Sequence, residues 1–322
     1  MALQRKILCL LAVAGITLAA AGPAQAKLGI GISEQSPNMF TNKYFKPLGF
    51  KYARIVVPWN ILQRKDYWPK YLQTWLDGAK ATGVEPMVAF NIIDVKPKYF
   101  GKGPTLGQYA TLIKGFRQKY PDVTTFTPWN EENHKFQPTF FSKKHSNGPK
   151  LAFQYYKTLK QACSSCTVLA ADVLDQSDMA LWLTKFKKYF GHGKGIWGLH
   201  NYQDANNHVP IKKSSTYKIT KVVKGDIWST EAGGIVYFKT IGGKTRKYSE
   251  SNALKAQKYL FKLMGDRRVK ARYKRVYIYD YYGTWDKRGK HDTGARWDSG
   301  LIGRGANGKP RPAYYDLKKR TK

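Results

Sequence analysis

Two glutamates, Glu131 and Glu231, lie at the ends of short apolar runs and could supply the two acid groups of a hydrolytic reaction. Glu131 comes just after residues 124–129, and Glu231 comes directly after residues 226–230. Hydrolysis of an acetal requires one carboxylic acid that protonates the leaving oxygen, and a second carboxylate that attacks or shields the oxocarbenium-like centre. We therefore predict that Glu131 and Glu231 act together across one cavity.

Polar and aromatic side chains also gather at or near the ends of other apolar runs, where a substrate could contact them. We expect binding roles for Arg54, Trp59, Asn91, Asn130, His200, Tyr202 and Trp285. Structural roles stay open for several of them. Arg54 could pair with a carboxylate at the edge of the core, since a buried charge needs a partner. His200 could be a rim histidine without a part in the chemistry, and Trp59 could belong to the core.

Eight β-branched or aromatic runs alternate with longer stretches along the chain, and several of these stretches are clearly amphipathic. The runs are residues 28–33, 52–57, 85–91, 124–129, 167–171, 195–200, 226–230 and 275–280. Helical spacing of apolar residues is clearest over 66–82, 105–120 and 249–267, whereas 204–224 could be a weak helix or a long loop. Such alternation predicts a parallel sheet with crossover helices. Eight units in about 300 residues favour a single (β/α)8 TIM barrel, with catalytic residues at the carboxyl ends of the strands.

An open doubly wound sheet is the alternative fold, but no Gly-rich dinucleotide fingerprint follows the first predicted strand. We see no linker and no second domain, so residues 27–322 are predicted to form one catalytic domain. In a closed barrel the fourth and seventh strands lie on opposite sides. This arrangement would place Glu131 and Glu231 face to face across the mouth.

With these positions the sequence resembles the clan A glycoside hydrolases, whose hallmark is an Asn-Glu pair after the fourth strand and a Glu after the seventh. The match is to Asn130-Glu131 and Glu231, and Trp129-Asn130-Glu131-x-Asn133 is similar to the W-N-E-P-N variant of that clan. The resemblance implies a retaining double displacement, usually at a β-linked bond of a polysaccharide. In it Glu131 is the acid/base, Glu231 attacks the anomeric carbon, and Asn130 binds the sugar 2-hydroxyl.

Other parts of the clan pattern also have counterparts here. Arg54 matches an arginine on the second strand that holds the nucleophile ionised, and His200-Asn201-Tyr202 matches a His-x-Tyr motif whose tyrosine bonds the nucleophile. Trp285 is the nearest candidate for the tryptophan that lies under the sugar after the eighth strand. The proton donor in such a pair needs a raised pKa, which burial and the negative charge of its partner would favour.

Glu132 departs from the clan pattern because it replaces the usual proline. Neighbouring side chains of an extended segment point to opposite faces, so only one of Glu131 and Glu132 should face the mouth. The spacing selects Glu131. We expect Glu132 to form a supporting hydrogen bond or to lie in solvent.

Two other functions remain open. A barrel that binds carbohydrate or a polyanion without cleaving it would keep the aromatic side chains and show no turnover. A metal-dependent barrel could use Glu131, Glu132, His134 and His200, but the other strand ends offer Arg, Asn, Trp and Tyr rather than more ligands for a hard metal. We therefore predict neither a metal nor a cofactor.

The first 26 residues have the pattern of a signal peptide, with basic Arg5 and Lys6, an apolar stretch over 7–21, and Ala24-Gln25-Ala26 before the cleavage point. No later stretch is long and apolar enough to span a bilayer. We therefore expect a secreted or cell-wall-associated protein. In that oxidising setting Cys163 and Cys166 should form a local disulfide. A redox centre would need the pair at the start of a helix, whereas here it follows a predicted helix, and a zinc site would need a second pair of ligands.

The formal net charge of +35, from 56 Lys and Arg against 21 Asp and Glu, should attract polyanions in a salt-dependent way. The basic residues are spread along the chain and no nucleic-acid-binding motif is present, so we expect no specific nucleic-acid partner. An anionic cell-envelope polymer is the partner that such a surface suggests, besides the polysaccharide substrate. We expect a monomer.

Overall fold

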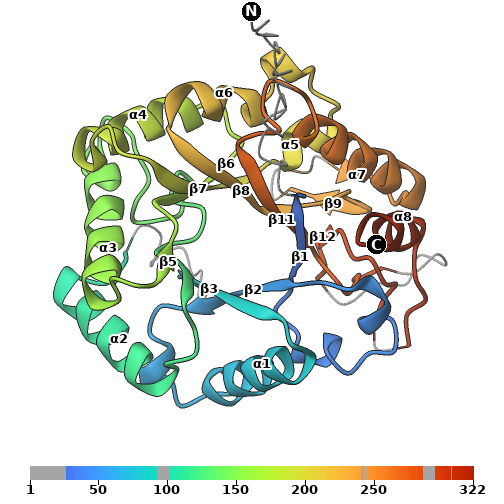
Figure 1. The fold of residues 1–322 in the computed structure, drawn as a ribbon, viewed down its shortest axis with the longest axis horizontal. Coiled ribbons are helices and arrows are strands. Elements are labelled where there is room, and N and C mark those ends of the chain that lie inside the picture. Colours follow the sequence, from blue (N-terminus) through green and yellow to red (C-terminus); the bar gives the residue numbers. More distant parts are fainter. Residues whose placement is uncertain (1–26, 93–101, 241–242, 244, 286–293, 306) are drawn as a thin grey trace, which may run out of the picture.

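The computed structural model describes residues 27–92, 102–240, 243, 245–285, 294–305 and 307–322. Residues 1–26, predicted to be a signal peptide, lie outside the described part. The chain forms a curled sheet of nine parallel strands with helices outside it (Figure 1). The strand order is β5-β4-β3-β2-β1-β11-β8-β7-β6. A smaller sheet of three short strands, in the order β10-β9-β12, is separate from it.

The strands of the large sheet follow the predicted apolar runs. They are β1 (Gly29–Ser33), β2 (Tyr52–Pro58), β3 (Glu85–Asn91), β4 (Thr125–Thr127), β5 (Thr167–Val168), β6 (Ala171–Leu174), β7 (Gly195–His200), β8 (Gly225–Ala232) and β11 (Tyr273–Tyr279). Such runs are typical of parallel strands that are buried on both faces.

The prediction of eight strands differs from the structure in the run 167–171, which is split into β5 and β6. β5 pairs with β4, and β6 pairs with β7. Between them the Leu169 N–H donates to the Phe126 carbonyl at 2.9 Å, and the Ala170 N–H donates to the Ile196 carbonyl at 2.7 Å. The two edge strands of the curled sheet are therefore consecutive in the chain, and the two residues that join them bond to opposite sides.

The helices confirm the clearest predicted amphipathic segments. They are α1 (Trp68–Thr82), α2 (Leu106–Lys119), α3 (Gly148–Ala162), α4 (Met179–Phe190), α5 (Tyr202–Asn206), α6 (Ser215–Val222), α7 (Glu250–Met264) and α8 (Pro312–Arg320). Short 3-10 turns are η1 (Pro37–Met39), η2 (Lys46–Leu48), η3 (Ile61–Gln63) and η5 (Ile211–Lys213). The uncertain segment 204–224 contains the end of α5, then η5 and α6.

Local sequence explains where these helices begin and which face they bury. α2 begins with a capping box in which the Thr105 and Gln108 side chains each accept a backbone N–H of the other residue. α1 ends at Gly83, whose left-handed φ of 68° suits glycine. Leu72, Trp75 and Ala79 of α1 are fully buried, which packs this helix against the core.

The interior of the curled sheet is filled by side chains from distant strands. Met87 of β3, Leu169, Trp228 of β8 and Tyr277 of β11 form one buried cluster. β3 and β8 are not neighbours in the sheet, so their side chains join one cluster because the sheet curves around them.

Among the helices that the structure describes, none has both the length and the apolar character needed to span a membrane.

The small sheet lies between β8 and α8 in the chain. Its strands are β9 (Tyr237–Lys239), β10 (Thr245–Arg246) and β12 (Trp297–Asp298), paired antiparallel. Phe238 and Trp297 pack edge to face with ring centroids 5.2 Å apart. Since β9 follows the carboxyl end of β8, these residues lie at the same end of the large sheet as Glu231.

Candidate active site

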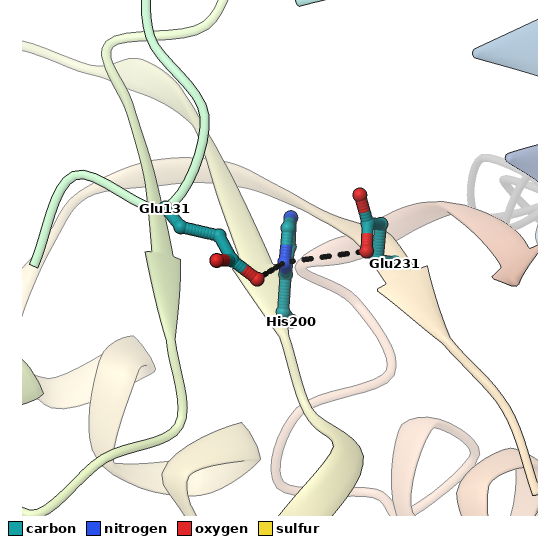
Figure 2. Close-up of side chains that lie close together, drawn as sticks. All are labelled: Glu131, His200 and Glu231. Carbon is teal, nitrogen blue, oxygen red and sulfur yellow. Dashed lines mark hydrogen bonds and ion pairs between the residues drawn. The ribbon is translucent and has the colours of Figure 1, made fainter. Parts of the chain in front are cut away.

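Glu131 and Glu231 come together at the carboxyl ends of the strands, as predicted (Figure 2). Glu131 follows β4, and Glu231 is the penultimate residue of β8. One carboxylate oxygen of each glutamate and a ring nitrogen of His200 all lie within 4.8 Å of one another. The Glu131 side chain is 24% exposed and that of Glu231 is 10% exposed, so both can be reached from a cavity.

The imidazole of His200 lies between the two glutamates (Figure 2). Its Nδ1 is 3.2 Å from Glu131 Oε1 and 3.7 Å from Glu231 Oε2, while Nε2 is 3.3 Å from Asp172 Oδ2. Burial lowers the pKa of His200, but the charges of Asp172 and Glu231 outweigh burial and raise it to about 10. His200 is therefore a buried cation at neutral pH, with a direct contact to the predicted acid/base.

Arg54 makes the second cationic contact of the site. Its Nη1 donates to Glu231 Oε1 at 2.5 Å, and its Nη2 donates to Asn130 Oδ1 at 2.6 Å and to Asp172 Oδ2 at 2.9 Å. Burial opposes the charged form, but the carboxylates of Glu231 and Asp172 raise the pKa of Arg54. The guanidinium thus holds Glu231 in place and orients Asn130 beside it.

Tyr202 contacts the other oxygen of Glu231. Its hydroxyl donates to Glu231 Oε2 at 3.2 Å, and its ring packs edge to face on Trp297 with centroids 4.9 Å apart. Burial and the negative charge of Glu231 raise the pKa of Tyr202, which keeps the phenol protonated as a donor. Both oxygens of Glu231 therefore accept a hydrogen bond.

Asp172 of β6 is a central residue of the site that we did not predict. It binds Arg54 and His200, and it also accepts a hydrogen bond from the Thr230 hydroxyl. Burial raises the pKa of Asp172, but the charges of His200 and Arg54 lower it below its usual value. Gly198 of β7 makes room for this carboxylate, because any side chain at that position would overlap it.

The backbone at Glu131 has a left-handed conformation, with a φ of 52°. This region is uncommon for residues other than glycine and costs of order 1–3 kcal/mol. Burial raises the pKa of Glu131, but the hydrogen bond and the charge of His200 lower it below the usual value. The expectation of a raised pKa at the proton donor is therefore wrong for the free protein, because His200 is charged.

Glu132 points away from Glu131, as expected, and is fully buried. Its Oε2 accepts the Asp172 N–H at 3.1 Å, and its own N–H donates to the Asp172 carbonyl at 2.9 Å. Burial raises the pKa of Glu132 well above the usual value. The expected supporting hydrogen bond is present. However, the two side chains diverge because of the left-handed turn at Glu131, and not because the segment is extended.

Two cavities meet at the carboxylates and share Glu131, Glu231 and Tyr279. The larger, of about 810 Å³, is also lined by His134, Leu174, Asp175, Gln176, Tyr202, Gln203, Asn206, Asn207, Ile235, Phe238, Thr240, Thr245, Arg246 and Trp297. The smaller, of about 530 Å³, is also lined by Gln35, Val56, Tyr67, Trp68, Tyr71, Asn91, Ile92 and Asn130. Cavities of this size are typical of small-molecule sites.

Of the three remaining predicted binding residues, one lines a cavity beside the glutamates and two do not. Asn91 lines the smaller cavity, where its Oδ1 accepts the Ile92 N–H at 2.8 Å. Trp59 packs against the core, and Trp285 stacks on Tyr237 with centroids 4.0 Å apart; neither lines the two cavities.

Tyr279, the last residue of β11, lies instead beside the glutamates and lines both cavities, and Trp297 lines the larger one. An aromatic residue next to the last position of the eighth predicted strand was the signal that could have identified Tyr279.

The ligand set considered for a metal is not gathered as proposed, because Glu132 faces the backbone of Asp172. Within the described residues, Glu131, His200 and Glu231 have the spacing of a metal site. Arg54 and Tyr202 already occupy both oxygens of Glu231, and the pKa of His200 keeps its ring protonated. This arrangement favours an ion-pair network over a cation site.

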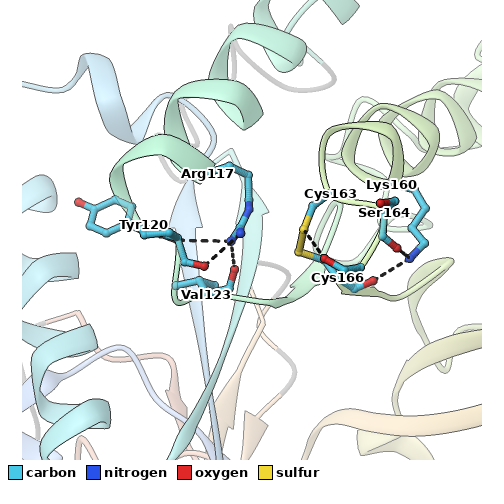
Figure 3. The surroundings of a disulfide bond; sticks show 9 residues. Arg117, Tyr120, Val123, Lys160, Cys163, Ser164 and Cys166 are labelled. Carbon is cyan, nitrogen blue, oxygen red and sulfur yellow. Dashed lines mark hydrogen bonds between the residues drawn. A yellow bond between two sulfur atoms is a disulfide. The ribbon is translucent and has the colours of Figure 1, made fainter.

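The disulfide between Cys163 and Cys166 is confirmed (Figure 3). Cys163 caps the carboxyl end of α3, and Cys166 directly precedes β5. Lys160 Nζ donates to the Ser164 and Cys166 carbonyls at 2.6 and 2.7 Å. The bridge closes the turn at the amino-terminal end of a strand, whereas the site is at the carboxyl ends.

Sequence searches found no matching family model and no matching curated protein. The fold is similar to solved structures, with a TM-score of 0.60 and 15% identity to the GH39 enzyme from Xanthomonas axonopodis pv. citri, covering 92% of this chain and 66% of that one. For β-glycosidase BGL167 the values are 0.59 and 12%, with 93% and 97% covered.

Bacteroides uniformis β-glucuronidase 2 gives a TM-score of 0.59 at 14% identity, with 91% of this chain and 35% of that chain covered. The chain thus spans about two thirds or less of the first and third of these proteins and nearly all of the second. These likenesses show that this chain shares the fold of known glycosidases.

Proposed function

We propose that this chain is a retaining glycoside hydrolase on a (β/α)8 barrel, in which β5 and β6 form one interrupted strand. Counting the two as one strand gives eight strands in the order of a closed barrel. The backbone bonds of Leu169 and Ala170 to β4 and to residue 196 of β7 support this closure, as does the buried cluster of Met87, Leu169, Trp228 and Tyr277. The similar structures are named as glycosidases, and several as β-glucuronidases.

The single observation that carries the proposal is the approach of Glu131 and Glu231 within 4.8 Å, with Arg54 bound to Glu231 alone of the two. Carboxyl groups about 5 Å apart are typical of retaining enzymes, and about 6.5–9.5 Å of inverting ones. Glu231, held in place by a cation and by the Tyr202 hydroxyl, is suited to attack. Glu131 does not share the contact with Arg54, so we assign it the role of acid/base, which donates and later removes a proton.

The proposed reaction proceeds in two steps. Glu231 attacks the anomeric carbon while Glu131 gives its proton to the leaving oxygen, so the sugar becomes an ester of Glu231. Glu131 then removes a proton from water, which attacks the same carbon and releases Glu231. While Glu231 is an ester its negative charge is absent, and the cationic His200 beside Glu131 then favours the deprotonated form that acts as base.

Export, the cell-wall location and the polysaccharide substrate belong to the same proposal. The sequence pattern of residues 1–26 supports export, and the net charge of +35 supports retention near an anionic envelope polymer. We propose that this charge concentrates the enzyme at its substrate and takes no part in bond cleavage. Raised salt should then weaken envelope binding more than it affects hydrolysis of a small substrate.

A hydrolysis screen tests the proposed function. Wild type and Glu231→Gln would be incubated with β-1,3- and β-1,4-glucans, xylan, mannan, galactan, uronate-bearing forms of these polymers and 4-nitrophenyl β-glycosides, at two salt concentrations. We expect cleavage by wild type, none by Glu231→Gln, and a first product with retained anomeric configuration by NMR. Glu85→Gln is the matched control and should stay active, because Glu85 is at the amino-terminal end of β3 and the site is at the carboxyl ends of the strands.

Unchanged hydrolysis in Glu231→Gln, or an inverted product, would contradict the assignment. Polymer binding without any cleavage by wild type would indicate the non-catalytic barrel instead.

A further inference from the structure

We infer that the two cavities form one cleft that holds a glycan chain on both sides of the cleaved bond, so that the enzyme cuts within the chain. This inference rests on the proposed function and specifies its substrate and mode of attack. Its basis is the shared lining: Glu131, Glu231 and Tyr279 belong to both cavities, and each cavity extends away from them in its own direction. An enzyme that removes one terminal sugar needs space for only one ring in the cavity that holds the sugar attacked by Glu231. Here each of the two cavities is as large as a complete small-molecule site.

The direction of the chain follows from Asn130. Asn130 lines the smaller cavity and not the larger one, and in the proposed reaction it contacts the sugar that Glu231 attacks. The smaller cavity therefore receives the part of the chain that becomes bonded to Glu231. The larger cavity receives the leaving part.

Part of the lining of the smaller cavity is an aromatic platform made of Tyr67, Trp68 and Tyr71. Tyr67 is 63% exposed, and its ring stacks on the buried Trp68 with centroids 5.4 Å apart and an interplanar angle of 27°. Tyr71 supports Tyr67 from the side, edge to face at 5.7 Å. One face of the Tyr67 ring is thus held by packing while much of the ring remains accessible.

The position of Tyr67 separates it from ordinary exposed side chains. Five large apolar or aromatic side chains of the described residues are exposed, namely Tyr67, Leu106, Leu181, Tyr189 and Tyr315, and of these Tyr67 alone lines either cavity. A rigid, accessible ring beside a carbohydrate site suits stacking on the apolar face of a sugar. The smaller cavity joins this platform to Asn91 and Asn130, so a chain of several sugars would contact both.

The larger cavity has a different lining, which suits the leaving part of the chain. Its polar groups include Asn207 and Arg246, and the Arg246 Nη2 donates to Asn207 Oδ1 at 3.0 Å. Two aromatic side chains of this cavity, Phe238 and Trp297, pack edge to face on each other and are less exposed than Tyr67, so they hold a product less firmly and allow it to dissociate after each cut. Chain binding is therefore expected to depend mainly on the platform.

Tyr67→Ala and the control Tyr315→Ala test this inference, since Tyr315 is 54% exposed on α8 and lines neither cavity. The substrates are the polymer that wild type degrades fastest in the screen and the 4-nitrophenyl glycoside of the same sugar. We expect wild type to release oligosaccharides of mixed length from the start and to lower the viscosity early. Tyr67→Ala should lose roughly fivefold more kcat/KM on the polymer than on the nitrophenyl glycoside, mainly through KM.

Tyr315→Ala should leave both kcat/KM values unchanged. Release of single sugars from the start, or an equal loss on both substrates in Tyr67→Ala, would overturn the inference while leaving the hydrolase proposal intact. Failure of the hydrolase proposal has a different signature, because wild type would then cleave neither substrate. A second readout is the affinity of the inactive Glu231→Gln protein for the polymer, which adding Tyr67→Ala should weaken by a similar factor.

Discussion

The Arg54 guanidinium lies 2.5 Å from a carboxylate oxygen of Glu231, and Arg54 is fully buried and Glu231 nearly so. The same guanidinium lies 2.9 Å from Asp172, so one buried cation pairs with two acids from different strands. Removing one partner of a buried pair leaves an uncompensated charge, which costs about 3–5 kcal/mol. We therefore expect Arg54→Met to lower the free energy of unfolding by that order, as measured by urea denaturation.

Lys80→Met is the control for that variant, because the Lys80–Asp122 pair is exposed on both sides and should contribute little. The loss of unfolding free energy in Arg54→Lys should lie between those of Arg54→Met and Lys80→Met, since lysine keeps the charge but cannot make the bidentate contact. An unfolding free energy for Arg54→Met equal to that of wild type would show that the network does not stabilise the fold.

Substitution of His200 should move the pH dependence of activity. The positive charge of His200 lowers the pKa of Glu131, so removing this charge in His200→Gln should raise that pKa. The acid/base must be protonated to start the reaction, so its pKa sets the basic limb of the kcat/KM profile. We expect this limb to move to higher pH in His200→Gln and to stay in place in His192→Gln, an exposed histidine. A basic limb that stays in place in His200→Gln would mean that His200 carries no charge that acts on Glu131.

The dependence of stability on pH should reveal Glu132. Its pKa in the folded protein is raised above the usual 4.5, so above pH 4.5 the native state binds more protons than the unfolded state, and stability falls as pH rises. The slope for one such group is up to about 1.4 kcal/mol per pH unit. Glu132→Gln lacks this slope, so its free energy of unfolding should rise relative to that of wild type as pH rises.

Urea denaturation of wild type and Glu132→Gln between pH 4.5 and 6.5 isolates this effect. His200 is present in both proteins, so its own titration contributes to both unfolding free energies and cancels in their difference. A difference in unfolding free energy that is the same at both ends of the window would show that Glu132 does not keep its proton on folding.

Much of the site could be predicted because its residues follow apolar runs at the carboxyl ends of strands. Glu131, Glu231, Arg54, Asn130, His200 and Tyr202 all meet where that rule places them. Asp172 was not predicted as a site residue because the fifth predicted strand ends at residue 171, whereas β6 continues to Leu174. A lone carboxylate within an apolar run needs a buried cation, and that requirement could have linked Asp172 to Arg54.

The remaining errors concern features that alternation and spacing do not encode. The left-handed backbone of Glu131 lies next to Glu132, whose side chain accepts the N–H of Asp172, 40 residues away in the chain. The charge on His200 depends on three carboxylates that only the folded chain brings together. Trp285 was chosen by proximity in sequence, but the chain turns after Tyr279 and directs Trp285 toward Tyr237.

Tyr202→Phe should separate positioning of the nucleophile from stability. The variant removes the hydrogen bond from the Tyr202 hydroxyl to Glu231 Oε2 and keeps the ring packing on Trp297. A hydrogen bond to a charged group contributes about 1.5–3 kcal/mol, so we expect kcat/KM to fall roughly 10- to 100-fold. Tyr259→Phe removes a comparable bond to the Val209 carbonyl, away from the glutamates, and should leave kcat/KM unchanged. Equal kcat/KM for Tyr202→Phe and wild type would show that this contact has no role in turnover.

The disulfide should contribute to stability without affecting catalysis. Cys163 and Cys166 close a loop of four residues, for which the chain-entropy model gives about 2 kcal/mol. The double variant Cys163→Ser/Cys166→Ser should therefore unfold at lower urea than wild type, and wild type with a reducing agent should behave in the same way. Because the bridge joins α3 to the start of β5, at the end of the sheet opposite to Glu131 and Glu231, kcat/KM below the unfolding range should not change. A loss of kcat/KM without a loss of stability would instead place the cysteines in the chemistry.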